Sequence, residues 1–246
     1  MAELLGLIGF GSFLTVSAVV GTRLLALARR TRRLPELAIG LNFVLAGLVG
    51  YGLLIAAESL RVLPAPWDGW GSLLGVTFMS LGCFALSVFT RRVFRPDALG
   101  ATFALGVLGG WLALGVVGSW FLHVAKAEEG TAGVWLGHWA PNLGMLAAYA
   151  WSSWEPLRYH RQLRLRAAMG LGDPLIANRM LLWSLGTGAI AGVAGVHFVT
   201  QLQGIHALPP QLVGVVSMLV LVTACAQWLA FFPPRGYVRR FAAPSS

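Results

Sequence analysis

The sequence predicts an all-α integral membrane protein built as one bundle of seven transmembrane helices. Of its 246 residues, 57% are hydrophobic and 11% charged, whereas an ordinary globular chain has about 25% charged residues. The mean hydropathy is +0.73. Seven apolar runs reach the roughly 20 residues that a helix needs to cross a hydrocarbon layer of about 30 Å. These values exclude a soluble domain, a disordered chain, a coiled coil and a disulfide scaffold.

The seven spans succeed one another through short connections, so residues 1–246 are predicted to form a single transmembrane domain. The predicted ranges are 4–28, 36–60, 70–90, 98–124, 132–156, 175–202 and 208–232. Three of the helix starts carry a proline beside an acid: Pro35-Glu36, Pro96-Asp97 and Asp173-Pro174. Proline suits a first helical turn, which needs no amide donor, and a carboxylate complements the positive end of the helix dipole.

The orientation of the bundle is predicted from the distribution of basic residues. Sixteen arginines belong to the 1–2, 3–4 and 5–6 connections and the C-terminal tail, and only Arg61 and Lys126 belong to the opposite face. The sixteen are Arg23, Arg29, Arg30, Arg32, Arg33, Arg91, Arg92, Arg95, Arg158, Arg161, Arg164, Arg166, Arg179, Arg235, Arg239 and Arg240. Because basic residues mark cytoplasmic loops, the N-terminus is predicted outside and the C-terminus in the cytoplasm.

The partners predicted from this charge are lipids. A net charge of +9 and a pI near 11 would suggest nucleic acid in a soluble chain, but here the arginines are expected to meet anionic headgroups at the cytoplasmic face. The chain is thus predicted to be a multi-pass protein of a cytoplasmic or plasma membrane, of the bacterial inner-membrane type. Loop 157–173 is predicted to extend the fifth helix along the membrane surface, or alternatively to dock a cytoplasmic protein.

Two arrangements of the helices remain open. An offset of 139 residues aligns Pro35 with Pro174 and Gly75 with Gly214, which would fit two parallel three-helix halves joined by the fourth span. Short connections instead favour a sequential ring in which each helix packs on its chain neighbours. We expect the ring. Glycine pairs such as Gly106 and Gly110 are expected to let helices approach closely.

Candidate binding residues gather toward the outer end of the fourth, fifth and sixth spans. They are Trp111, Ser119, His123, Trp135, His138, Trp139, Asn142, Tyr149, His197 and Gln201. On the fifth span, Trp135, His138, Trp139, Asn142 and Tyr149 share one helical face.

Three interpretations of this cluster remain open. Tryptophan, tyrosine and histidine accumulate at membrane interfaces, so the cluster is typical of an aromatic belt. An inward-facing set of these side chains would instead line a small-molecule pocket that opens outward. A metal or haem site would use His123, His138 and His197, although no ligand-spacing motif supports it and the cofactor stays unassigned.

The preferred functional hypothesis is a receptor-like sensory or ligand-binding membrane protein. The layout is similar to receptor and rhodopsin architectures as a topology, but span 208–232 has no lysine for a retinal Schiff base. One alternative is a facilitative permease for a small neutral solute, lined by Ser, Thr, Asn and Gln such as Asn42, Thr223 and Gln227. A second is a haem- or metal-binding protein. No span has a carboxylate at its centre to act as acid or base, which disfavours an enzyme.

Overall fold

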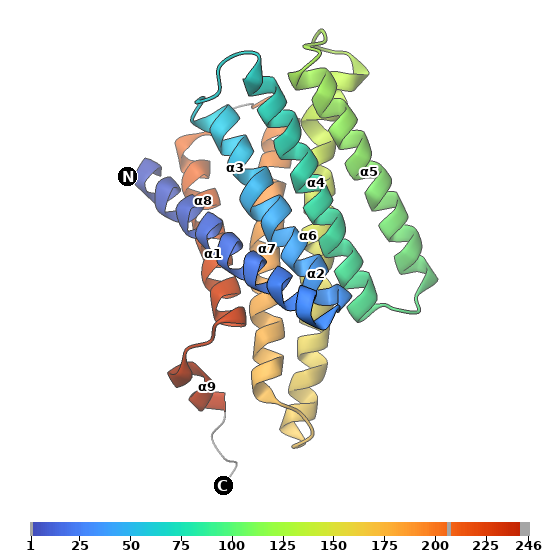
Figure 1. Cartoon of the computed structure of the whole chain (residues 1–246), viewed down its shortest axis with the longest axis vertical. Coiled ribbons are helices and arrows are strands. Elements are labelled where there is room, and N and C mark those ends of the chain that lie inside the picture. The colour runs from blue at the N-terminus through green and yellow to red at the C-terminus, as the bar shows by residue number, and fades with distance from the viewer. Residues whose placement is uncertain (1, 206–207, 242–246) are drawn as a thin grey trace.

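The computed structural model describes residues 2–205 and 208–241, and every regular element in them is helical (Figure 1). The long helices are α1 (Ala2–Thr31), α4 (Trp67–Phe94), α5 (Leu99–His123), α6 (Ala132–Ala168), α7 (Pro174–Leu202) and α8 (Pro210–Phe231). One further rod combines α2 (Leu34–Leu41), the π-helix η1 (Asn42–Gly50), α3 (Tyr51–Leu54) and the π-helix η2 (Ile55–Ser59), and a short α9 (Arg235–Phe241) follows α8.

Six helices of the described chain are long and apolar enough to cross a membrane, which is consistent with a multi-pass helical membrane bundle. They are Gly6–Thr31, Leu34–Ser59, Trp67–Phe94, Leu99–His123, Pro174–Leu202 and Pro210–Phe231. Helix α6 occupies the place of the predicted fifth span and is 37 residues long, but its polar side chains keep it out of this set.

Two predicted helix starts are confirmed and one is shifted. Pro35 lies in the first turn of α2 together with Glu36, and Asp173 Oδ1 accepts a hydrogen bond of 2.8 Å from Leu175 N at the start of α7. The Pro96-Asp97 pair lies in a turn before α5, which begins at Leu99 after an extended Ala98.

The predicted extension of the fifth helix is confirmed, but its direction differs from the expectation. Helix α6 runs without a break from Ala132 to Ala168. Figure 1 shows that α6 and α7 project together as a hairpin beyond the ends of α1 and α2 instead of bending onto a surface. The packing of α6 along α7 holds it in line with the bundle.

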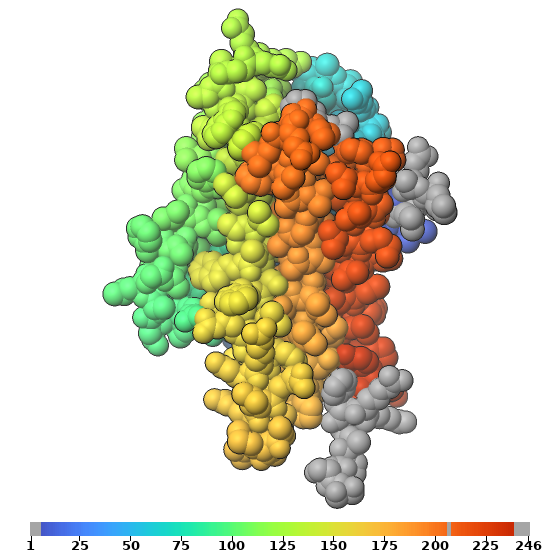
Figure 2. Space-filling view, turned by 180° about the vertical axis from the view of Figure 1, so that it is seen from behind, coloured from blue at the N-terminus to red at the C-terminus, as the bar shows by residue number. Residues whose placement is uncertain are grey.

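The sequential ring is confirmed for six of the seven predicted spans. Helix α1 packs on α2 and η1, these pack on α4, α4 packs on α6, and α8 returns to α1 after α6 and α7. The expectation is wrong for the fourth span: α5 lies outside the ring and covers the seam between α4 and α6, which is the place that the plan of two three-helix halves gave to this span. Figure 2 shows α6, α7 and α8 side by side on the back face, with α5 protruding at the edge.

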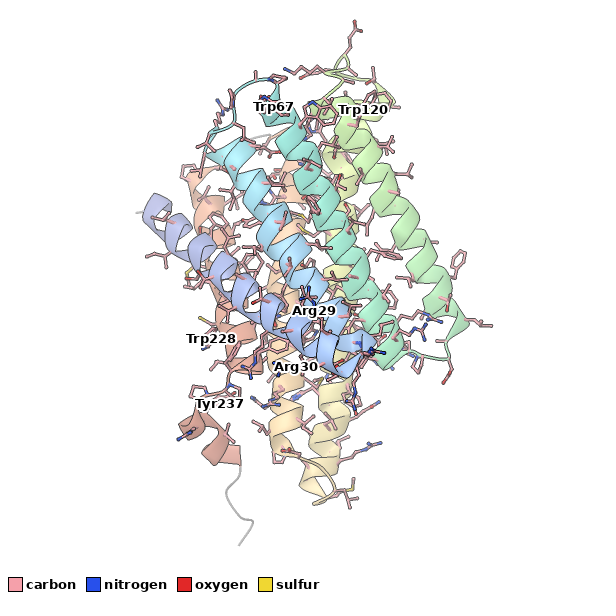
Figure 3. The ribbon with its side chains drawn as sticks, in the orientation of Figure 1. Arg29, Arg30, Trp67, Trp120, Trp228 and Tyr237 are labelled. Atoms are coloured by element: carbon pink, nitrogen blue, oxygen red, sulfur yellow. The ribbon has the colours of Figure 1, made fainter. Side chains whose placement is uncertain are left out.

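The two ends of the bundle differ in their surface residues. Trp67 and Trp120 mark one end, which we call the tryptophan end, and Arg29 and Arg30 lie toward the other, the arginine end (Figure 3). Helices α1, α4, α6 and α8 run from the tryptophan end toward the arginine end, and the α2–η2 rod, α5 and α7 run back.

Close packing of α5 on α6 uses a different glycine pair from the expected one. A Cβ at Gly106 or Gly110 would meet nothing within 4 Å, so this face of α5 points away from the bundle and the prediction for this pair is wrong. A Cβ at Gly118 would instead overlap the backbone of Gly137, and one at Gly115 would come within 3.1 Å of Pro141 N. The prediction that glycines of this helix allow close packing is correct, but the packed face of α5 is a different one. Glycine spacing alone does not show which side of a helix meets a neighbour.

We predict that Gly118→Leu lowers the thermal stability of the purified protein. The added side chain has to separate α5 from α6, and overpacking of this kind costs roughly 1–3 kcal/mol or more. Thermal unfolding in detergent measures the change, with Gly110→Leu as the matched control on the open face of the same helix. Equal unfolding temperatures for the two variants would contradict this packing.

Candidate functional site

The predicted cluster at the tryptophan end joins α6 to α7. Asn142 Nδ2 donates a hydrogen bond of 2.9 Å to Gln201 Oε1. Trp139 packs edge-on against Phe198, with ring centroids 5.8 Å apart, and stacks on Trp135 at 4.7 Å. Trp135 itself is half exposed on the outer surface. Asn142 and Gln201 thus pair through one hydrogen bond, and Trp139 packs against Phe198 nearby.

The α5 members of the cluster are also bonded within the protein. Trp111 Nε1 donates to the carbonyl oxygen of Ala140 on α6 at 3.0 Å, and Ser119 Oγ donates to Gly115 of its own helix at 2.9 Å. His123 Nε2 lies 4.0 Å from Glu58 Oε1. Ligand binding by this cluster therefore stays a prediction.

The remaining predicted residues do not form one group. His138 and His197 are half-buried on α6 and α7. Within residues 2–205 and 208–241 no three His, Cys, Asp or Glu side chains come together as a group that could hold a metal ion. Tyr149 lies two helical turns from Asn142, and it belongs to a different site in the centre of the bundle.

This second site is a group of uncharged polar side chains, which we call the polar centre. It consists of Asn42, Tyr149, Thr187, Thr223 and Gln227, contributed by η1, α6, α7 and α8, and all five are at least nine-tenths buried. They line a cavity of about 10 Å³. The other lining residues are Phe13, Phe43, Gly47, Trp183, Gly186 and Ile190.

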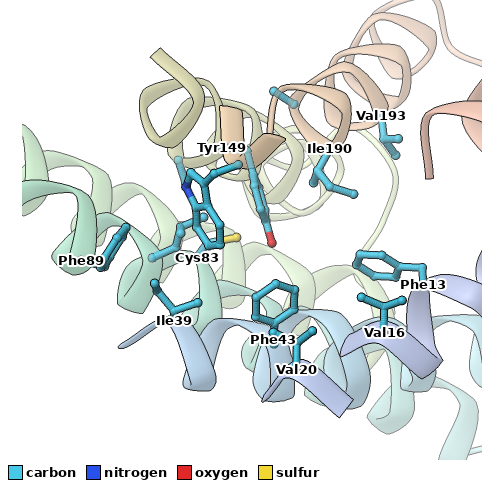
Figure 4. Packing of buried hydrophobic residues seen from close by; sticks show 14 of the residues in the cluster. Phe13, Val16, Val20, Ile39, Phe43, Cys83, Phe89, Tyr149, Ile190 and Val193 are labelled. Carbon is cyan, nitrogen blue, oxygen red and sulfur yellow. The ribbon is translucent and has the colours of Figure 1, made fainter. Parts of the chain in front are cut away.

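Hydrogen bonds of the polar centre involve five helices. Asn42 Nδ2 donates to the carbonyl oxygen of Gly82 on α4 at 3.1 Å and to Tyr149 Oη on α6 at 3.2 Å. Thr223 Oγ1 on α8 lies 3.1 Å from the carbonyl oxygen of Gly186 on α7 and 3.0 Å from that of Leu219 on its own helix, and it shares its one hydrogen between them. Figure 4 shows the ring of Tyr149 reaching into the interior near Phe43. Each of these groups has a protein partner.

Two polar atoms at the cavity have no protein partner. Gln227 Oε1 and Trp183 Nε1 are buried without a hydrogen bond, and their residues are 3% and 6% exposed. A buried unpaired polar atom costs about 1–3 kcal/mol. One is an acceptor and the other a donor, so a guest that donates and accepts would satisfy both. A cavity of this size is about large enough for one water molecule.

The cavity adjoins an irregular helix. The π-helix η1 begins at Asn42 and includes Gly47, which lines the cavity. The wider turn of a π-helix is rare and frequently marks a functional site. Gly47 also lets α1 approach, because a Cβ there would come within 2.5 Å of Ser17 Oγ.

The surroundings of the cavity differ on its two sides. Toward the tryptophan end lie the buried apolar residues Val193, Val216 and Val220, which separate the polar centre from Asn142 and Gln201. Toward the arginine end the interior contains polar pairs beside an aromatic group, in which Trp183 packs edge-on against Phe89 and Phe231 at ring-centroid distances of 5.9 and 5.8 Å. Thr90 Oγ1 and Ser152 Oγ are 2.7 Å apart, and Arg95 Nε donates to Glu155 Oε1 at 3.0 Å.

The sequence contained the members of the polar centre without showing that they meet. Asn42 is a lone amide on its span, and Thr223 and Gln227 are four residues apart, which is one helical turn, on the last predicted span. Interhelical hydrogen bonding is the ordinary explanation of such residues. The signal that could have found the site is Gln227, because a long buried amide has four hydrogen-bonding positions to satisfy.

Comparison with other proteins supplies no family for the chain. No protein-family model matches it, and no curated protein and no solved structure is significantly similar to it. We therefore infer the function from the geometry of the polar centre.

We predict that Gln227→Leu leaves the stability of the guest-free protein unchanged or raises it. The substitution removes an unpaired acceptor and fills its place with an apolar side chain, which relieves a desolvation cost. Thr223→Val is the matched control one turn away, and it should lower stability by about 1 kcal/mol because its hydroxyl is bonded. Thermal unfolding checks both, and a large loss of stability in Gln227→Leu would contradict the unpaired state of this amide.

Proposed function

We propose that the protein is a receptor-like, ligand-binding membrane protein of seven helices that binds a small uncharged molecule at the polar centre. The observation that carries the proposal is the unpaired acceptor Gln227 Oε1 and the unpaired donor Trp183 Nε1 at one buried cavity. Polar groups are expensive to bury unpaired, and inside a membrane bundle they commonly serve function. The tryptophan-end cluster is less favoured because Asn142 and Gln201 already pair with each other.

The lining of the cavity defines the class of ligand. No lining residue is charged, so a charged ligand would have no counter-ion and would carry the full cost of burial. A ligand with both a donor and an acceptor, such as a hydroxyl or primary amide, matches the free atoms. An aromatic wall of Phe13, Phe43 and Trp183 suits an apolar part of the same molecule.

Binding at this place would be coupled to a change in the bundle. The closed cavity of about 10 Å³ accommodates no more than a water molecule, so a larger ligand has to separate helices. The π-helix η1 supplies a deformable wall beside Asn42. A ligand that binds the open arrangement better shifts the equilibrium toward it, which is the behaviour of a receptor.

A facilitative permease for a small neutral solute is the second candidate. The observation that favours it is polarity at the middle of the bundle, where a transported solute needs hydrogen bonds. The apolar layer of Val193, Val216 and Val220 opposes it, because a path would have to cross this layer. A haem or metal function has no further support among the described residues.

We also propose that α6 spans the membrane as the seventh span and that the N-terminus lies outside. The sixteen-to-two division of basic residues supports the orientation. Cysteines introduced one at a time at Glu128 and at Arg164, in a Cys225→Ala background that keeps only the buried Cys83, should differ in sealed cells. Impermeant maleimide should label the first and not the second, and labelling of the second would overturn the orientation.

Ligand binding is tested by thermal unfolding of the purified protein in nanodiscs with acetamide, propanol or glycerol. We expect at least one of them to stabilise the wild type, by about 2.7 kcal/mol at a hundred times its dissociation constant. Gln227→Leu should lose this stabilisation and Gln201→Leu should keep it. If Gln201→Leu loses the stabilisation and Gln227→Leu keeps it, the binding site lies at the tryptophan end. If no probe stabilises the wild type, the proposed ligand class is wrong.

Receptor and permease are separated by a flux measurement. Proteoliposomes placed in an iso-osmotic glycerol solution should swell no faster than protein-free vesicles if the protein binds without transporting. Faster swelling that Gln227→Leu abolishes would replace the receptor with the permease.

A further inference from the structure

A groove of about 550 Å³ follows the junction of α1 and α8 on the outer surface of the bundle. Its walls are residues of α1 between Leu7 and Val16 and the indole of Trp228 on α8. The two helices lie side by side in Figure 1, and Figure 3 shows Trp228 at the arginine-end part of α8. Both helices are apolar enough to cross a membrane, so the groove faces lipid chains.

A cation lies just beyond the arginine end of this groove. The guanidinium carbon of Arg23 is 4.7 Å from the ring centroid of Phe232, and Phe232 stacks on Trp228 at 4.7 Å. Arg23 is exposed. No carboxylate of the described chain forms an ion pair with it. The aromatic ring holds one face of the guanidinium and leaves its N–H edge free for an anion.

The separation between the groove and the cation matches one leaflet. Gly11 precedes Arg23 by twelve residues, which is about 18 Å along a helix. Half of a hydrocarbon core of about 30 Å is ~15 Å, so a lipid whose phosphate meets Arg23 extends its acyl chain along the groove to Gly11. Gly11 leaves room there, since a Cβ on it would meet nothing within 4 Å.

We propose that the α1–α8 groove is a binding site for one anionic phospholipid, with its phosphate on Arg23 and an acyl chain between Gly11 and Trp228. The charge and the depth of the groove select the occupant. A lipid phosphate fits an arginine at leaflet depth, and a lipid of net negative charge is favoured over a zwitterionic one because the choline of the latter would bring a second cation beside the guanidinium. The site is on the opposite side of α1 and α8 from the interior of the bundle, and it does not depend on the proposed ligand at the polar centre.

The test counts lipids that stay with the protein. Wild-type protein is reconstituted in vesicles of equal parts phosphatidylglycerol and phosphatidylcholine, extracted in mild detergent and examined by native mass spectrometry. We expect one phosphatidylglycerol to be retained in preference to phosphatidylcholine. Arg23→Gln should reduce its retention about fivefold, the contribution of one basic residue near an anionic lipid, and Gly11→Leu should reduce it by filling the groove.

Two matched variants control for general effects. Arg29→Gln removes an exposed arginine six residues along α1, about 120° away from Arg23 around the helix, and Gly110→Leu adds the same side chain to an open face of α5. Both should retain the lipid as the wild type does. Equal retention of the two lipids, equal losses in Arg23→Gln and Arg29→Gln, or full retention in Gly11→Leu would each overturn the proposal. Far-ultraviolet circular dichroism confirms that every variant is helical.

Discussion

The structure depends on the hydrogen bonds that α6 makes with its neighbours. Polar side chains that a helix buries inside a bundle need hydrogen-bond partners, and most of those partners lie on other helices. Tyr149 pairs with Asn42 of η1, Ser152 lies beside Thr90 of α4, and Asn142 bonds Gln201 of α7. The same polar residues keep α6 out of the set of helices that hydropathy identifies. The polar side chains of α6 thus lower its hydropathy and also supply its hydrogen bonds to other helices.

Proline inside α6 contributes to this pattern. Pro156 has no amide hydrogen, so it leaves the carbonyl oxygen of Ser152 without its helical donor. Thr187 Oγ1 of α7 lies 3.3 Å from that oxygen and 2.9 Å from the carbonyl oxygen of Trp183 on its own helix, so its one hydrogen is shared between them. Neighbouring hydroxyls are the groups that make proline tolerable in membrane helices. The packing of α6 on α7 therefore serves the backbone as well as the side chains.

The sequence predicted the helices better than their contacts. Apolar runs identify where a chain crosses lipid, and the starts at Pro35 and Asp173 follow from local chemistry. The π-helix η1 has no comparable signal, because it is a change in backbone winding within an apolar run. Convergence of Asn42, Tyr149 and Gln227 on one cavity depends on how the helices rotate about their axes, and close contacts at the cavity, such as Gly186 on Gln227, limit that rotation.

The same limit applies to the candidate site. The binding site was predicted at the tryptophan end because histidine and tryptophan gather near the helix ends there, and such residues are often functional. In the structure Asn142 and Gln201 are partly exposed and hydrogen-bonded to each other, while the cavity at the polar centre is lined by a buried acceptor and a buried donor without partners. Which polar group lacks a partner is a property of tertiary packing, and one sequence does not contain it.

The most direct test of this account is a cryo-electron microscopy map of the protein in nanodiscs, at a resolution that shows bound water. The account predicts non-protein density within hydrogen-bonding distance of both Gln227 Oε1 and Trp183 Nε1, which the cavity between α7 and α8 would hold. An empty cavity, or a Gln227 side chain bonded fully to its own helix bundle, would contradict it.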